Sequence, residues 1–178
     1  MSITKMLKFF ILCIGINVLL VTGQCPTVKV SEKIAYEKLA GHWHGRYLSN
    51  DLLKHINNLD IIITYEQNKG LINASANSGG TPINFRGTYD VSADGSPDTN
   101  ARFTFDILTG TYTLLSDYKC YLFVHGCPAA LNGGESTILY FRDNNPSKEC
   151  ENSGVATVKN TGFDFGKVAL DPTSSSSG

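Results

Sequence analysis

A regular series of short β-patterned segments is the feature of this sequence that most restricts its fold. Turn-forming residues stand between most of the segments, as at Asn68-Lys69-Gly70, Gly79-Gly80 and Asn132-Gly133-Gly134. Eight strands are the number at which an up-and-down antiparallel barrel can enclose one small molecule. A two-sheet sandwich also fits this spacing, although Trp43 does not lie between paired cysteines as in immunoglobulin domains. The eight candidate strands cover residues 42–49, 59–67, 71–77, 83–91, 101–108, 111–117, 119–127 and 136–142.

The first 23 residues have the layout of a secretory signal peptide. Lys5 and Lys8 precede an apolar run from Phe9 to Val21, and small residues lead up to Gly23. At ~13 residues the run is short for a membrane span, so an uncleaved anchor is the weaker alternative. We therefore expect a signal peptide over 1–23, one folded domain over 24–170, a flexible Ser-rich tail over 171–178, and no membrane insertion.

The net charge and the cysteine count of the chain that is expected after cleavage indicate its partners and its disulfide bonds. Cleavage removes two of the 15 Lys and Arg but none of the 16 Asp and Glu, which leaves a net charge of about −3 and argues against a nucleic-acid partner. Four of the five cysteines remain: Cys25, Cys120, Cys127 and Cys150. An even count in a secreted chain predicts two disulfides, for which three pairings are open. No Cys-x-x-Cys pair occurs, so a zinc site built from these cysteines is a weaker alternative.

Three local motifs occur in a fixed order along the strands. Gly41-x-Trp43 opens the first strand, Ser116-Asp117-Tyr118 lies between the sixth and seventh, and Arg142 ends the eighth. This ordered set resembles the three short conserved regions of the lipocalin family, with Ser116 where the family more often has Thr. The resemblance runs from Cys25 to about Leu170 and is nearest to arthropod pigment-binding (insecticyanin and bilin-binding) and apolipoprotein D-like members. It implies an all-β fold built as an eight-stranded up-and-down barrel. Ser147 has the spacing of a helix start, so the sequence itself predicts a C-terminal helix near 147–159, and the pattern over 162–170 predicts a short extra strand.

The resemblance also implies structural roles at the closed end of the barrel. The residues concerned are Gly41, Trp43, Asp117, Tyr118 and Arg142. Arg142 is expected to lie over the indole of Trp43, where a desolvated cation–π contact contributes ~1–2 kcal/mol. These residues are therefore expected to build the floor of the barrel and not to touch a ligand.

Strand parity predicts which side chains face the barrel interior, because alternate residues of a strand point to opposite faces. An inward Trp43 also turns Gly45 inward, and the same alternation brings in Ile72 and Gly126. The small residues are expected to leave room, and Phe85 fits either a lining or a packed core. The predicted ligand-binding residues are Tyr47, Ile61, Ile63, Tyr65, Ala74, Ala76, Phe85, Phe103, Phe105, Ile107, Leu122, Val124, Ile138 and Tyr140.

Asn73 begins the N-glycosylation sequon Asn73-Ala74-Ser75. The parity that turns Ala74 inward turns Asn73 outward, where a glycan can be accommodated. We therefore predict glycosylation at Asn73, with an unmodified strand asparagine as the alternative.

The histidines are the residues that most suggest a metal site, a haem site or an active site, but their sequence context argues against each of these. His42 and His44 flank Trp43 and are expected on the outer face, but no carboxylate or cysteine stands at ligand spacing, so exposed histidines and no metal are predicted. Asp60 is interpreted as a solvated acid on an outward face. Haem would need an inward histidine, and neither His55 nor His125 is placed for it. No Gly-x-Ser-x-Gly occurs, so neither an enzyme nor a cofactor is expected.

Two functions fit these observations. The first is a secreted, extracellular carrier that encloses a small hydrophobic ligand, such as a bilin pigment, a sterol, a fatty-acid derivative or another lipid. The alternative is a salivary-type or immune-type protein that binds a host protein, such as a protease, through the loops at 51–58, 92–99 and 128–135. A cavity on the order of several hundred Å³ favours the carrier, whereas a filled barrel favours the alternative.

The resemblance gives a disulfide pairing that can be tested directly. It pairs Cys25 with Cys127 across the amino-terminal arm and leaves Cys120 for Cys150, each bridge contributing about 2–4 kcal/mol. We expect peptide mapping without reduction to recover these two pairs. A peptide that joins Cys25 to Cys120 or to Cys150 would contradict the assignment.

Overall fold

The computed structural model describes residues 28–29, 34–67, 69–91, 100–105, 109–128, 131 and 134–173, with the backbone alone described at 90–91, 100–103 and 105. The expected signal peptide, Cys25, Ile107, the loop at 92–99 and residues 174–178 of the expected tail lie outside the described residues.

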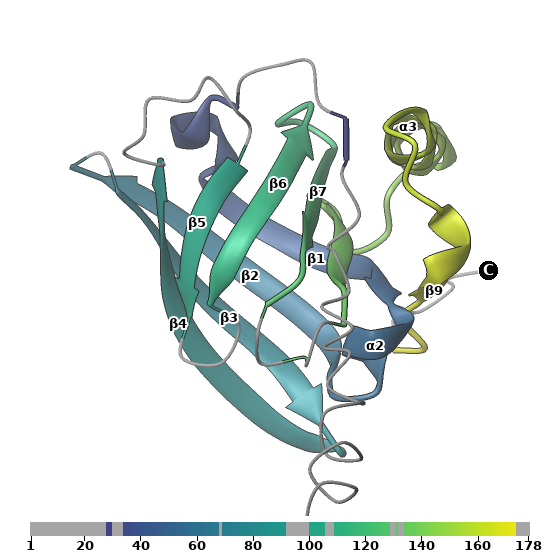
Figure 1. Cartoon of the computed structure of the whole chain (residues 1–178), viewed down its shortest axis with the longest axis horizontal. Helices are drawn as coiled ribbons and strands as arrows, with labels where there is room; N and C mark the ends of the chain where they lie inside the picture. The colour runs from purple at the N-terminus through teal and green to yellow at the C-terminus, as the bar shows by residue number, and fades with distance from the viewer. Residues whose placement is uncertain are drawn as a thin grey trace, which may run out of the picture.

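Eight antiparallel strands form an up-and-down barrel, which confirms the predicted fold class. Each strand pairs with the next in sequence, and β1 pairs with both β2 and β8, so the sheet closes on itself (Figure 1). The strands are β1 (Gly41–Ser49), β2 (Asn57–Glu66), β3 (Lys69–Ser78), β4 (Thr81–Val91), β5 (Asn100–Phe105), β6 (Gly110–Ser116), β7 (Tyr121–Gly126) and β8 (Ser136–Phe141).

Alternation of burial along β3 shows how the sequence builds the barrel wall. Gly70, Ile72, Ala74 and Ala76 are buried, whereas the residues between them are exposed, Asn73 among them. One apolar face per strand is what a sheet needs when it buries only its inner surface. The inward side chains of the strands, with Leu39 of η1 (Tyr36–Leu39) and Leu52 of α2 (Asn50–Leu53), form the main core.

Helix α3 (Lys148–Asn160) lies outside the barrel, beside β7 (Figure 1). Ser147 is its N-cap, and the Ser147 side chain accepts a hydrogen bond from the backbone N–H of Cys150. Val158 of the helix is fully buried against the outward side chains of β7 and β8. This second core explains why β7 and β8 are buried on both faces: it contains Val28, Tyr121, Phe123, Leu139, Phe141, Val158 and Phe163.

The extra strand after the helix is shorter than the predicted 162–170. The carboxylate of Asp164 accepts a hydrogen bond from the N–H of Gly166, which favours the 3₁₀ turn η3 (Phe165–Lys167) over an extended chain. Only β9 (Val168–Leu170) is a strand, and it pairs with the end of β1.

The expectation that Tyr47 faces the barrel interior is wrong. The register of β1 against β8 shifts between Gly45 and Tyr47, so an extra residue interrupts the alternation. Tyr47 therefore points outward, where its hydroxyl donates a hydrogen bond to Glu151 of α3 and its ring packs on Phe165. Leu48 takes the inward place and is fully buried in the main core.

Arg142 and Trp43 meet at the closed end of the barrel. The guanidinium lies 3.7 Å from the centre of the indole ring, and the indole N–H donates to the carbonyl of Leu39 at 2.8 Å. Arg142 also donates to the carbonyls of Lys38, His42 and Tyr118. One side chain thus joins η1, β1 and the turn after β6.

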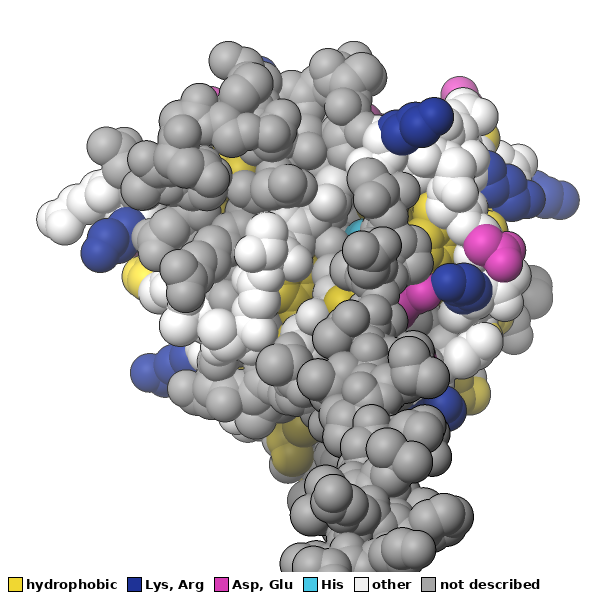
Figure 2. Space-filling model, viewed as in Figure 1, with side chains coloured by type: hydrophobic (Ala, Val, Ile, Leu, Met, Phe, Trp, Pro, Cys, Tyr) yellow, Lys and Arg dark blue, Asp and Glu magenta, His cyan; other side chains and the backbone are white. Residues whose placement is uncertain are grey.

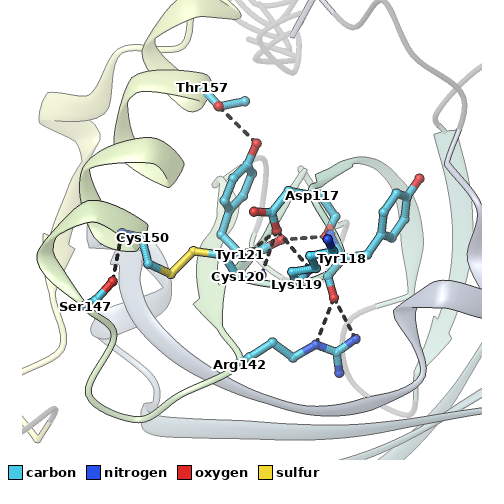
Figure 3. The surroundings of a disulfide bond; sticks show 10 residues. Asp117, Tyr118, Lys119, Cys120, Tyr121, Arg142, Ser147, Cys150 and Thr157 are labelled. Atoms are coloured by element: carbon cyan, nitrogen blue, oxygen red, sulfur yellow. Dashed lines mark hydrogen bonds between the residues drawn. A yellow bond between two sulfur atoms is a disulfide. The ribbon is translucent and has the colours of Figure 1, made fainter.

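That turn is organised by Asp117, as Figure 3 shows. One carboxylate oxygen accepts the backbone N–H groups of Lys119, Cys120 and Tyr121, at 2.8–3.1 Å. Cys120 forms a disulfide with Cys150 of α3, with the two Cα atoms 5.8 Å apart. This is the pairing that the resemblance implies. Cys127 is also disulfide-bonded, but the predicted Cys25 lies outside the described residues.

Replacing Arg142 tests how much the floor depends on its planar guanidinium. In Arg142→Lys the charge stays, but one ammonium cannot stack on Trp43 and also reach the three carbonyls. We expect the free energy of unfolding to fall by about 2–3 kcal/mol, measured by urea denaturation. The matched control is Arg86→Lys on the exposed outer face, which should change it by less than about 0.5 kcal/mol. Equal losses in the two variants would contradict this role of Arg142.

Candidate functional site

The barrel interior holds a small apolar cavity between the closed and open ends. Its volume is about 40 Å³, room for little more than a few water-sized groups. All its described walls come from the inner faces of the strands and from η1. The lining residues are Leu39, Leu59, Ile61, Ile63, Ile72, Phe85, Tyr89, Tyr112, Leu114, Leu122, Val124, Ser136, Ile138 and Tyr140.

Half of the fourteen predicted ligand-binding residues line this cavity: Ile61, Ile63, Phe85, Leu122, Val124, Ile138 and Tyr140. Ala74, Ala76 and Tyr65 belong to the same core without lining the cavity. Phe103 and Phe105 lie on β5 opposite Tyr89 and Gly87, and the structure describes their backbone alone. Ile107 is outside the described residues, and Tyr47 faces helix α3.

Six lining residues were missed by the sequence reasoning. Tyr89, Tyr112 and Leu114 follow the same alternation on β4 and β6, but on these two strands the sequence-based prediction names only Phe85. Period-two counting on those strands would have found them. Leu59 and Ser136 lie at strand positions that the same counting reaches, whereas Leu39 lies on η1, outside the strands.

Glycines on the inner face do not leave the volume that was expected of them. Gly126 lies opposite Tyr112 in the sheet, and a Cβ on this glycine would come within 2.5 Å of the tyrosine ring. The same arrangement joins Gly70 to Tyr89, where a Cβ would come within 1.9 Å of the ring. Each ring therefore occupies the space above a glycine on the neighbouring strand. This filling accounts for the small cavity.

The described lining carries hydroxyl groups but no charged side chain. Burial raises the pKa of Tyr112 to about 12 and also raises the pKa of Tyr89 and of Tyr140. The tyrosines are therefore neutral at physiological pH, and they can donate or accept hydrogen bonds. The Tyr89 hydroxyl already donates to the carbonyl of Tyr36. Such a site suits a neutral, mainly apolar molecule.

On the outer face, the expectation that no carboxylate accompanies the histidine pair is wrong. The β1–β2 register places His44 opposite Asp60, and the His44 ring nitrogen Nδ1 lies 2.7 Å from an Asp60 oxygen. Ligand atoms of His42, His44 and Asp60 lie within 4.8 Å of one another. The separation of 16 residues in sequence hid this contact, which depends on the pairing of two strands.

Basic and acidic side chains are scattered over the described part of the face in Figure 2 and do not gather into one patch. Among the described residues, no helix is long and apolar enough to cross a membrane.

No family model matches the chain, and no curated protein matches its sequence. Solved structures do match it. The amine-binding protein of Rhodnius prolixus in complex with tryptamine has a TM-score of 0.67 at 17% identity, over 84% of this chain and 86% of that one. Insecticyanin from the tobacco hornworm Manduca sexta has a TM-score of 0.61 at 18% identity, over 83% and 85%. Lobster apocrustacyanin A1 has a TM-score of 0.61 at 17% identity, over 75% and 76%. These proteins are lipocalins, and the chain has the lipocalin fold.

Alkaline titration tests the burial of the cavity tyrosines. An unfolded tyrosine ionises near pH 10, whereas Tyr112 in the folded protein holds its proton to about pH 12. The stabilisation is therefore complete below pH 10 and is lost as the pH rises toward 12. The expected loss is up to about 1.4 kcal/mol per pH unit for each such tyrosine.

Urea denaturation at pH 9, 10 and 11 should show this decline, and Tyr112→Phe should make it shallower because phenylalanine has no proton to lose. Tyr140→Phe should have the same effect. Identical pH slopes in the two variants and the original protein would contradict the assignment.

Proposed function

We propose that this chain is a lipocalin that binds one compact, neutral and largely apolar molecule inside its barrel. The observation that carries the proposal is the cavity lined by the inner faces of the strands, whose described lining is apolar apart from a few hydroxyl groups. Concave apolar sites with a few polar groups are typical of small-molecule binding sites. The shared fold with ligand-binding lipocalins supports the same conclusion.

The charge of the ligand follows from the walls. An ammonium or carboxylate enclosed here would lose its hydration without meeting an opposite charge among the described lining residues, which is costly. The Rhodnius protein was solved with tryptamine, an amine. This chain offers the hydroxyl of Tyr140 instead, which suits a carbonyl, a hydroxyl or an indole N–H.

The size of the ligand follows from the rings that fill the interior. A cavity of about 40 Å³ admits a small ring system only after modest outward movement of the walls. A bilin or a sterol requires a much larger displacement of Tyr89 and Tyr112, which close over glycines of the neighbouring strands. Among the candidates from the sequence, we therefore favour compact molecules over bilins and sterols.

Secretion and glycosylation belong to the same proposal. The disulfide between Cys120 and Cys150 is the kind of bond that persists in oxidising compartments, which supports an extracellular location. Asn73 is exposed on the outer face of β3, where a glycan can project into solvent.

A second function is favoured by the nearly filled interior. A cavity of several hundred Å³, which would favour a carrier, is absent from the described part of the barrel, and a filled barrel favours recognition of a protein partner through the loops. Of those loops, 51–58 is described, whereas 92–99 and much of 128–135 are not. The backbone N–H of Glu135 donates to Asp51, so the described parts of 51–58 and 128–135 lie together, and a partner would bind at this end of the barrel.

Fluorescence of Trp43, the single tryptophan of the chain, can report binding in the interior. We expect quenching or a spectral shift with compact neutral aromatics such as naphthalene derivatives, and weaker effects with retinol, biliverdin or tryptamine. Ile72→Phe adds volume at a lining position and should weaken binding at least about tenfold.

The matched control is Leu71→Phe, because Leu71 precedes Ile72 on β3 but is 40% exposed on the outer face. It should leave the affinity unchanged, and circular dichroism should show both variants folded. If no member of the panel binds, or if both variants weaken binding equally, interior binding is excluded. Cross-linking to a protein partner through the 51–58 loop would then support the second function.

A further inference from the structure

The outer face of the β1–β2 pair gathers three side chains that metal ions prefer. His42 and His44 stand two residues apart on β1, so both point away from the interior, opposite to the fully buried Trp43 between them. Asp60 of β2 reaches the same face because the antiparallel register pairs it with His44. The barrel scaffold therefore holds all three on a rigid part of the sheet.

The distances among these groups are short. Nδ1 of His44 and an oxygen of Asp60 are 2.7 Å apart, and the two imidazole rings lie with their centres 4.1 Å apart. One ligand atom from each residue can be chosen so that all three lie within 4.8 Å of one another. Ligand atoms of a tetrahedral zinc ion, at about 2.0–2.2 Å from the metal, are about 3.3 Å apart. Side-chain rotations that move the ligand atoms by about 1–1.5 Å close the set around an ion, and His42 is exposed to solvent.

We propose that His42, His44 and Asp60 form a zinc-binding site on the outside of the barrel, with water in the fourth position. Two imidazoles and one carboxylate are a ligand set that zinc takes in tetrahedral sites. The carboxylate balances part of the ion's charge and, in the absence of metal, orients the ring of His44 through their hydrogen bond.

The surroundings leave room for an ion and its water. His42 and Asp60 lie in an outer groove whose other lining residues include Ile62, Asn73 and Arg86. Among the described residues that line the groove, Arg86 carries the positive charge. It lies on β4, which β3 separates from β2. Arg142 donates to the backbone carbonyl of His42, which leaves the imidazole itself available.

Isothermal titration of the full mature protein with zinc chloride tests the site, and the protein must carry no histidine tag. We expect one zinc ion per chain with micromolar affinity. His42→Ala, His44→Ala and Asp60→Asn should each weaken binding at least about tenfold. His55→Ala is the matched control, because His55 is exposed but lies outside the cluster, and it should bind zinc like the original protein.

Imidazole nitrogen resonances give a second readout that does not depend on the variants. Zinc should shift the signals of His42 and His44 and leave those of His55 and His125 in place. Circular dichroism of each variant separates loss of the site from loss of the fold. The absence of zinc binding, an equal loss in His55→Ala, or shifts confined to His55 would overturn the proposal. Binding in the barrel interior is a separate property, so Ile72→Phe should leave zinc binding unchanged.

Discussion

The contact between Arg142 and Trp43 is the interaction on which the barrel's architecture depends. The guanidinium stacks on the indole and donates to carbonyls of η1, β1 and the turn after β6. Those segments are distant in sequence, so one side chain closes the end of the barrel and fixes the position of β1. Because side-chain direction alternates along a strand, fixing Trp43 inward decides which residues near it face the cavity and which face outward.

The strands could be predicted from the sequence because alternation and turn residues are local signals. What could not be predicted depends on contacts between segments. The bulge after Gly45 reverses the direction of Tyr47, and it arises from pairing with β8 and from the contact with Glu151 on a helix about a hundred residues away. Asp60 joins His44 through strand register alone. The helix near 147–159 was placed within one residue, since Ser147 provides a cap that is visible in the sequence.

Inward small residues were expected to leave space, but the structure shows that glycine on one strand is paired with a tyrosine on the next. Tyr112 lies over Gly126, and Tyr89 lies over Gly70. The space over an inward glycine can thus be filled by an aromatic ring of the neighbouring strand instead of a ligand. Only the cross-strand pairing shows which of the two applies, and the sequence alone does not give that pairing. This pairing leaves a small cavity whose described lining is apolar apart from a few hydroxyl groups.

The bulge in β1 has a further consequence for the chain. Before the bulge, Trp43 packs in the barrel core. After the bulge, Tyr47 packs at the interface with helix α3, whereas Leu48 packs in the barrel core. Removing or adding one residue there exchanges these two side chains between environments of different shape and polarity. The length of this strand is therefore as strictly determined as the identity of its residues.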